Sequence, residues 1–112
     1  MNLENSWQIY SNKFFNESKT VVVKIGSALL IDDSIGDINK SWLSCLAEDI
    51  SNLKDKGKKV IIVSSGAVAL GKKIFHSDSE KLDLEQSQAA AAVGQIKLCQ
   101  AYQEHFDPLG IK

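Results

Sequence analysis

The sequence predicts an α/β fold with a parallel sheet, either as one small domain or as the front part of a larger one. Two β-branched runs, Thr20–Ile25 and Lys59–Ser64, have the length and composition of buried strands. Between them, residues 40–56 repeat apolar side chains at helical spacing, which predicts an amphipathic helix. A strand, a helix and a strand in this order form a right-handed crossover between parallel neighbours.

The composition excludes several classes of protein. The chain has 112 residues, of which 44% are hydrophobic and 24% charged, as in one ordinary globular unit. Its 13 basic and 14 acidic residues leave a net charge of -1, so no overall field favours nucleic acid or an anionic membrane. The longest aliphatic runs are too short to span a membrane, and we expect a cytoplasmic protein. Cys45 and Cys99 match no metal-ligand spacing and are expected as reduced thiols in the core.

Residues 1–18 are expected to form an N-terminal extension. They are polar with interspersed aromatic residues, and Trp7, Tyr10 and Phe14 recur at helical spacing. This spacing predicts a short helix with one apolar stripe. We expect the helix to fold against its own domain, and a partner-binding arm is the alternative.

The predicted long helix has recognisable signals at both ends. The glycine and short polar side chains of residues 32–37 predict a surface turn between the first strand and this helix. Asn39 is expected to cap the start of the helix and Gly57 its end. After the second strand, another helix is expected to open at Gly66.

The C-terminal part of the sequence predicts a helix in two pieces. Asp83 and Gln86 have capping-box spacing at the start of an alanine-rich helix. Gly94 is expected to bend or interrupt this helix before it continues to Phe106. Residues 111–112 have the character of the start of a third strand.

Glycine and hydroxyl residues follow both predicted strands: Gly26 and Ser27 after the first, and Ser65, Gly66 and Ala67 after the second. In a parallel sheet these positions share the carboxyl edge, where α/β proteins bind their ligands. Glycine lets backbone N–H groups approach an anion, and a helix that starts near Gly66 adds unpaired donors. The pattern predicts a phosphate or carboxylate site, whereas the alternative is that the glycines only make tight turns.

Lys24 lies inside the first apolar strand, in a chain whose basic residues are all lysine. A charged side chain there is costly unless its ammonium group is paired or reaches water, so Lys24 is a candidate phosphate ligand. A snorkelling lysine is the alternative. Placed about 4 Å from a transferring phosphoryl group, one positive charge contributes up to about 4 kcal/mol, or roughly a thousandfold in rate.

Two phosphate-binding motifs are considered and set aside. Residues 66–73 match G-x-x-x-x-G-K, but Lys73 stands where Mg²⁺ needs a serine or threonine, and the intervening residues favour a helix. The G-x-G-x-x-G fingerprint of dinucleotide-binding enzymes is missing from the sequence. His76 and His105 have no partners at metal or nucleophile spacing, so we expect both to be exposed and predict no metal-ligating residue.

Three motifs resemble the amino-terminal half of the glutamate 5-kinase family, within the amino acid kinase superfamily. They are VVKIGSALL at 22–30, VSSGAVALG at 63–71 and QAAAAVGQ at 88–95, and the resemblance covers about residues 19–112. It implies a three-layer αβα sandwich with a mostly parallel sheet, incomplete at the C-terminus. It also implies ATP-dependent phosphorylation of the side-chain carboxylate of L-glutamate to glutamyl 5-phosphate, with Mg²⁺, in proline biosynthesis.

The resemblance implies roles for the residues at the two strand ends. Lys24 would contact the ATP phosphates and stabilise charge during transfer, with Gly26 and Ser27 as donors from the loop. Glutamate would be bound by the residues after the second strand, namely Ser65, Gly66 and Ala67.

The domain of this family continues well beyond residue 112, so the resemblance implies a truncated portion that lacks turnover alone. Its protein partner would be a missing C-terminal half or a second copy in a homo-oligomer. Two alternatives remain open. The chain could be a non-catalytic binding module that pairs with a separate kinase half, or part of another kinase of the superfamily.

Overall fold

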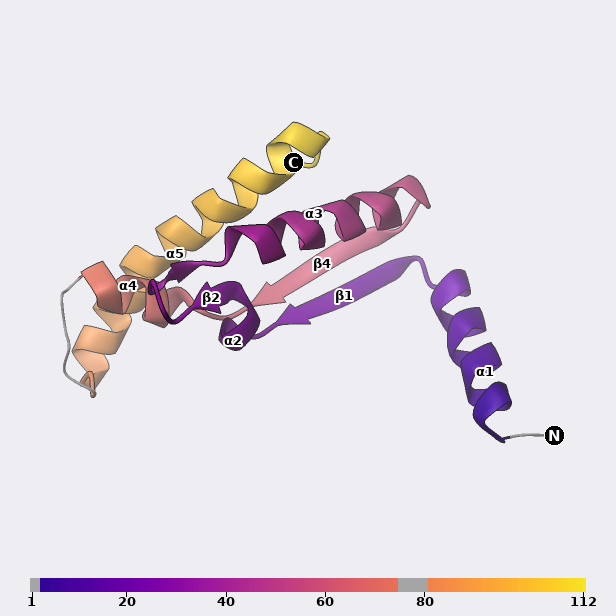
Figure 1. Cartoon of the computed structure of the whole chain (residues 1–112), viewed down its shortest axis with the longest axis horizontal. Helices are drawn as coiled ribbons and strands as arrows, with labels where there is room; N and C mark the ends of the chain where they lie inside the picture. Colours follow the sequence, from indigo (N-terminus) through magenta and orange to yellow (C-terminus); the bar gives the residue numbers. More distant parts are fainter. Residues whose placement is uncertain (1–2, 75–80) are drawn as a thin grey trace.

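The computed structural model of the chain describes residues 3–74 and 81–112 (Figure 1). His76 therefore lies outside the described residues. Over the described ranges, no helix is long and apolar enough to cross a membrane. In chain order, the elements are α1 (Leu3–Glu17), β1 (Thr20–Ile25), α2 (Ser27–Leu30), β2 (Ile31–Asp32), β3 (Asp37–Ile38), α3 (Lys40–Asp55), β4 (Lys59–Ser64), α4 (Ala67–Ile74), α5 (Leu84–Phe106) and the 3₁₀ turn η1 (Asp107–Leu109).

The strands β1 and β4 pair in parallel, as predicted, and have the predicted bounds. Val23 and Ile62 pack against the core from one face of this sheet. The opposite face is exposed, and Val22 and Ile61, which lie side by side on it, are 61% and 52% accessible. The expectation of fully buried strands is therefore wrong, because the described helices cover the sheet on one side.

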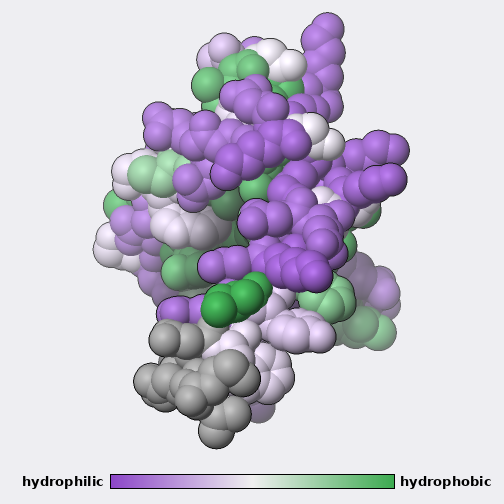
Figure 2. All heavy atoms as spheres, turned by 90° about the vertical axis from the view of Figure 1, so that its right-hand side faces the viewer, coloured by the Kyte–Doolittle hydropathy of each residue, from purple (hydrophilic) through white to green (hydrophobic). Residues whose placement is uncertain are grey.

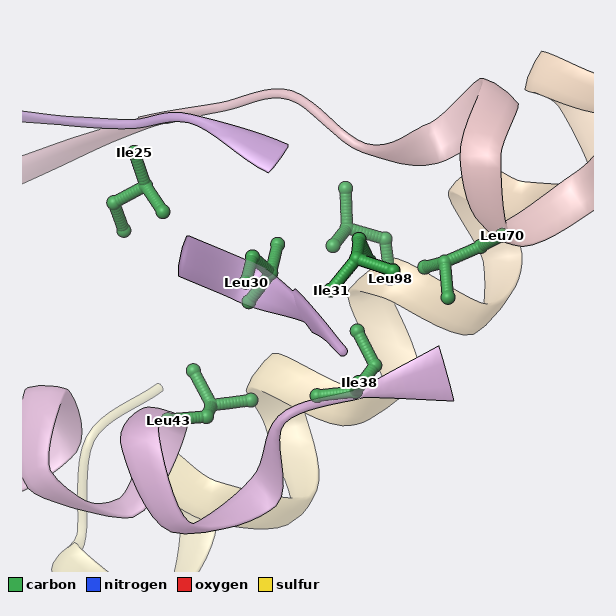
Figure 3. Close-up of a cluster of buried hydrophobic side chains, with 7 residues drawn as sticks. All are labelled: Ile25, Leu30, Ile31, Ile38, Leu43, Leu70 and Leu98. Carbon is green, nitrogen blue, oxygen red and sulfur yellow. The ribbon is translucent and has the colours of Figure 1, made fainter. Parts of the chain in front are cut away.

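The hydrophobic core gathers side chains from β1, α2, the β2–β3 hairpin, α3, α4 and α5 (Figure 3). The amphipathic helix α3 contributes Leu43, which is fully buried together with Leu30 from α2. Burying a leucine of this kind stabilises the fold by about 1.5 to 3 kcal/mol. The cluster consists of Ile25, Leu30, Ile31, Ile38, Leu43, Leu70 and Leu98.

The ends of α3 follow the predicted signals. The Asn39 side chain accepts a hydrogen bond from the Trp42 N–H at 3.2 Å, which satisfies one of the free donors at the helix start. After the helix, Gly57 adopts a left-handed φ of 79°, and the Lys58 N–H donates to the Leu53 carbonyl at 3.1 Å. A residue with a Cβ would be strained at Gly57, so the glycine permits this helix end.

The helix α5 begins at the predicted capping box, in which Asp83 and Gln86 exchange hydrogen bonds of 2.7 and 3.1 Å. It then runs without interruption from residue 84 to residue 106, so the predicted interruption at Gly94 is wrong.

Gly94 is instead a packing residue. A Cβ at this position would lie 1.6 Å from the Ala67 carbonyl oxygen, and one at Gly71 would lie 1.7 Å from the Ala90 carbonyl oxygen. The two glycines therefore let α4 and α5 cross with their backbones in contact.

The segment between β1 and α3 is more structured than the predicted turn. The short helix α2 and the hairpin β2–β3 fill it, with Ile31 opposite Ile38 and the turn at residues 33–36. Residues 111–112, expected as the start of a strand, are not in a strand in the structure.

Three side-chain predictions differ from the structure. Cys45 and Cys99 are free thiols, but both are exposed rather than in the core. His105 is half-buried, and its Nδ1 lies 2.8 Å from the Ala101 carbonyl oxygen in the preceding turn of α5. These residues occupy positions of α3 and α5 that the core does not reach.

The N-terminal helix forms as predicted, but it does not fold against the domain. It projects from the rest of the chain (Figure 1), and Trp7, Tyr10 and Phe14 are 75%, 67% and 72% exposed. Its C-terminal end is held by the buried Lys58, whose ammonium group donates to the carbonyls of Phe15 and Ser18 at 2.6 Å. The same ammonium lies 4.9 Å from the centroid of the Phe15 ring.

Candidate functional site

The turns that follow β1 and β4 lie side by side at one edge of the sheet. Ile25 is paired with Ser64 at the ends of the two strands. The Ser65 N–H then donates to the Ile25 carbonyl at 3.1 Å, so pairing continues one residue beyond β4. This bond brings the first turn, which starts at Gly26, next to the second, as the predicted parallel register requires.

The first turn has an open backbone. Gly26 caps α2 with φ of -82° and ψ of 155°, and Ser27 is the first residue of that helix. Both residues are exposed, and a Cβ on Gly26 would meet no atom within 4 Å. Packing within this chain therefore does not require a glycine at position 26. The lack of a side chain leaves the backbone accessible to an approaching ligand.

The second turn requires its glycine. Gly66 has a φ of +111°, which side-chain-bearing residues rarely adopt, and a Cβ there would lie 3.4 Å from Ile31. The helix α4 begins at Ala67, where backbone N–H groups lack acceptors within the helix. The exposed Ser65 places its Oγ 3.4 Å from the Ile25 carbonyl. A hydroxyl and helix-end donors thus stand together, which suits an anionic group.

Lys24 stands two residues before Gly26, on the exposed face of the sheet beside Val63. Its ammonium group can reach water there, so the burial cost that singled it out does not arise in the described chain. Its position next to the first turn remains the reason to consider it. The structure brings Ser65 next to Ile25, after which the turn with Gly26 and Ser27 begins, and Lys24 lies one strand position before Ile25.

Sequence reasoning missed a hydrogen-bonded pair behind the second turn. The Tyr102 hydroxyl, from α5, donates to Ser64 Oγ at 2.9 Å, and Ser64 Oγ lies 3.1 Å from the Ser65 carbonyl oxygen. Burial raises the pKa of the Tyr102 phenol, while the hydrogen bond with Ser64 acts in the opposite direction. The partners are 38 residues apart, and no local pattern connects them. The pair ties α5 to the residue that precedes the second turn.

The G-x-x-x-x-G-K match at residues 66–73 does not form a phosphate-binding loop. Residues 67–74 are the helix α4, as predicted, and Gly71 is buried in its contact with α5. The ammonium group of Lys73 donates to the Ile35 carbonyl in the β2–β3 turn. Both motif residues therefore have structural roles.

The donors around the two turns are an ammonium group, hydroxyl groups and backbone N–H groups, with no carboxylate among the candidate residues. Such a set fits the phosphates of a nucleotide or a substrate carboxylate. It does not supply the carboxylate oxygens that Mg²⁺ prefers. Over the part of the chain that the structure describes, no group of three or more His, Cys, Asp or Glu residues could hold a metal.

Comparison with known proteins gives consistent matches. The sequence model of the amino acid kinase family matches residues 19–112. The glutamate 5-kinases of Ruegeria sp. (strain TM1040) and Jannaschia sp. (strain CCS1) are 53% and 54% identical over 94 residues, which are 84% of this chain and 26% of each relative. The glutamate 5-kinase of Caulobacter vibrioides is 44% identical over 97 residues, 87% of this chain and 26% of its own length. The chain thus spans about a quarter of the length of these curated relatives.

Proposed function

The chain belongs to the amino acid kinase family, and on this premise we propose that it serves the ATP-dependent phosphorylation of L-glutamate. Its relatives at 44% to 54% identity are named glutamate 5-kinases. Because the chain spans about a quarter of their length, the proposal concerns a larger kinase domain. Residues 19–112 would form its amino-terminal portion and residues 1–18 an extension. The product, glutamyl 5-phosphate, would enter proline biosynthesis.

The observation that carries the proposal is the hydrogen bond from the Ser65 N–H to the Ile25 carbonyl. It holds the two turns next to each other, and Gly26, Ser27 and Ser65 in them are exposed to solvent. Transfer between ATP and a carboxylate needs two anionic groups side by side, and most of the catalysis comes from positioning and charge stabilisation. One turn would bind the phosphates and the other the amino acid.

We assign the phosphate side to Lys24, Gly26 and Ser27. In the reaction, a side-chain carboxylate oxygen of glutamate attacks the γ-phosphorus of ATP. The bond from that phosphorus to the bridging oxygen breaks, ADP leaves with the electron pair, and an acyl phosphate forms. Lys24 would stabilise the negative charge that the transferring group carries between donor and acceptor.

We assign the glutamate side to Ser65, Gly66 and Ala67. The Ser65 hydroxyl and the backbone donors at the start of α4 would bind carboxylate oxygens and orient the acceptor. Mg²⁺, bound through the ATP phosphates, would neutralise phosphate charge.

The complete domain would be a three-layer αβα sandwich with a mostly parallel sheet. The exposed apolar face of β1 and β4, formed by Val22, Ile61 and Val63, supports a second helical layer that would cover it. The free thiols Cys45 and Cys99 are consistent with a reducing compartment, and we propose the cytoplasm.

The same exposed face favours a second candidate function, that of a non-catalytic module that docks a separate kinase half. In this case residues 19–112 would complete a partner's fold without contributing a functional Lys24. The two candidates differ in whether the turns take part in the chemistry.

A hybrid kinase tests the proposal. Residues 19–112 replace the matching segment of the Ruegeria relative, and ADP release is measured with glutamate, ATP and Mg²⁺. We expect glutamate-dependent turnover, and we expect Lys24→Met to lower kcat about a hundred- to a thousandfold because a positive charge is lost near the transferring group. Lys59→Met is the matched control, since Lys59 is exposed at the opposite end of the sheet, beside Thr20, and should change kcat less than about twofold.

Three results would contradict this assignment. Comparable kcat values for Lys24→Met and Lys59→Met would remove the role of Lys24. A preference for aspartate or a nucleotide as acceptor would favour another kinase of the superfamily. A folded hybrid that binds neither ATP nor glutamate would favour the non-catalytic module.

A further inference from the structure

The helix α1 carries an aromatic surface that the proposed kinase function does not explain. We call Trp7, Tyr10 and Phe14 the α1 stripe; they are two-thirds or more exposed. The family match begins only at residue 19, after this helix. Figure 1 shows α1 pointing away from the sheet, and Figure 2, which faces this side of the molecule, shows a mainly hydrophilic surface interrupted by smaller apolar patches.

We propose that the α1 stripe pairs two copies of this chain through antiparallel α1 helices. The stripe residues are separated by three and then four positions, the spacing of the apolar seam along which two helices pack. A copy related by a two-fold axis presents the same seam, so one surface serves both partners. The positions to either side of the seam carry polar side chains, such as Ser11 and Lys13.

The area that the stripe can bury fits a weak, specific dimer. An aromatic side chain buries about 150–250 Å² in full, and the exposed fractions leave roughly 100–180 Å² of each one available. Six such side chains offer about 600–1,080 Å² to the interface, and the upper part of this range reaches the roughly 1,000 Å² that a biological contact requires. We therefore expect a dissociation constant in the micromolar range.

The antiparallel arrangement follows from charge and from the position of the domain. Glu17 occupies the next seam position after Phe14, so a parallel pair would place two Glu17 carboxylates against each other. An antiparallel pair also opposes the two helix dipoles favourably. Because each domain follows the C-terminal end of α1, the two domains then lie at opposite ends of a helix pair about 22 Å long and do not collide.

The helix α1 is already held in position by contacts with the domain before it pairs. The bonds from Lys58 to the carbonyls of Phe15 and Ser18 hold the last turn of α1 in place. A helix that is already formed and anchored loses less conformational entropy on pairing than a free segment does. The stripe is thus presented in a fixed direction.

The association test uses the whole 112-residue chain in sedimentation equilibrium. We expect reversible dimers, and we expect the double variant Trp7→Ser/Phe14→Ser to weaken them at least a hundredfold, because four of the six aromatic side chains of the paired stripes are lost. Ile9→Ser is the matched control: Ile9 is 68% exposed on α1 but lies away from the stripe, and its loss should change the constant less than about threefold.

A cross-linking test addresses orientation. In a chain with Cys45→Ser and Cys99→Ser, Ser11→Cys lies near the two-fold axis of an antiparallel pair and should oxidise to a covalent dimer. Asn12→Cys, which points away from the stripe, should stay monomeric. Failure of Ser11→Cys to cross-link would overturn the antiparallel arrangement.

Two further outcomes would overturn the proposal as a whole. One is a chain that stays monomeric up to about 1 mM, because the free energy of association would then be weaker than about 4 kcal/mol. The other is a dimer that the double stripe variant does not weaken, which would place the contact elsewhere, such as on the exposed face of β1 and β4. Kinase activity is not involved in any of these measurements, so failure of the proposed function would leave them unaffected.

Discussion

Single glycines decide how closely the two C-terminal helices can approach. Gly94 and Gly71 each face a backbone carbonyl of the other helix, and neither position has room for a methyl group. The crossing is therefore set by residues that have no side chain. A change of one carbon atom must move a whole helix.

We predict that Gly94→Ala lowers the free energy of unfolding by at least about 3 kcal/mol, because the added Cβ would overlap the Ala67 carbonyl. Urea denaturation followed by circular dichroism measures this change. Gly26→Ala is the control, since the position has a negative φ and open space around it, and should cost less than about 1 kcal/mol. Similar losses in both variants would contradict the packing role of Gly94.

Tyr102 gives a prediction that depends on pH. Its folded pKa is raised by burial, so the unfolded chain ionises first as the pH increases. The stabilisation from the neutral phenol is complete below about pH 10, the usual tyrosine value, and is lost as the pH rises through the folded pKa. Tyr102→Phe should cost about 1 kcal/mol at pH 7 through the lost bond to Ser64, and this difference should shrink above pH 10.

Unfolding in urea at pH 7 and at about pH 10.5 checks the Tyr102 prediction. The exposed Tyr10 provides the comparison, because Tyr10→Phe should leave the free energy of unfolding nearly unchanged at both values. A Tyr102→Phe penalty that stays constant across this range would show that the phenol does not control the pH dependence.

At the scale of elements, Lys58 attaches α1 to the domain. We predict that Lys58→Met lowers the free energy of unfolding by about 1.5 to 3 kcal/mol, because charge-assisted bonds to the carbonyls of Phe15 and Ser18 disappear. Hydrogen exchange should accelerate at residues 14–17, in the last turn of α1. Lys56→Met, an exposed change in the same loop, should stay within about 0.5 kcal/mol, and an equal effect of both would refute the anchoring role.

The elements that could be predicted from sequence are those with local causes. The β-branched runs predict β1 and β4, and the caps at Asn39 and Asp83 depend on residues within three positions. The short elements before α3 have distant causes: the Asn39 N–H donates to the Leu30 carbonyl, and Lys73 reaches the turn after β2 from another helix. Their stability comes from tertiary contacts, which periodicity does not reveal.

The candidate site also has some features with local causes, which the sequence predicts, and others that depend on distant residues. Glycine and hydroxyl residues after the strands predict the two neighbouring turns, because parallel strands end at one edge. The exposure of Lys24 and the support of Ser64 by Tyr102 depend on which face of the sheet the helices cover. That choice is made by packing, so the sequence alone could not supply it.

At the scale of the whole molecule, we predict that the 112-residue chain has no measurable turnover. Gly26, Ser27 and Ser65 are all exposed to solvent, whereas phosphoryl transfer needs a site that excludes water and surrounds both substrates. ADP release with glutamate and Mg²⁺-ATP should equal the background without glutamate. Glutamate-dependent release that Lys24→Ala abolishes would disprove this prediction.

The helix α1 enters the sheet at the start of β1, whereas the two glycine turns follow the far ends of β1 and β4. The six residues of β1, about 20 Å of extended chain, separate α1 from these turns. A biosensor experiment can use this arrangement. A chain tethered to a chip by its amino terminus would keep the two glycine turns directed toward the flowing solution. Nucleotide or amino acid injected over such a surface would meet the turns unobstructed.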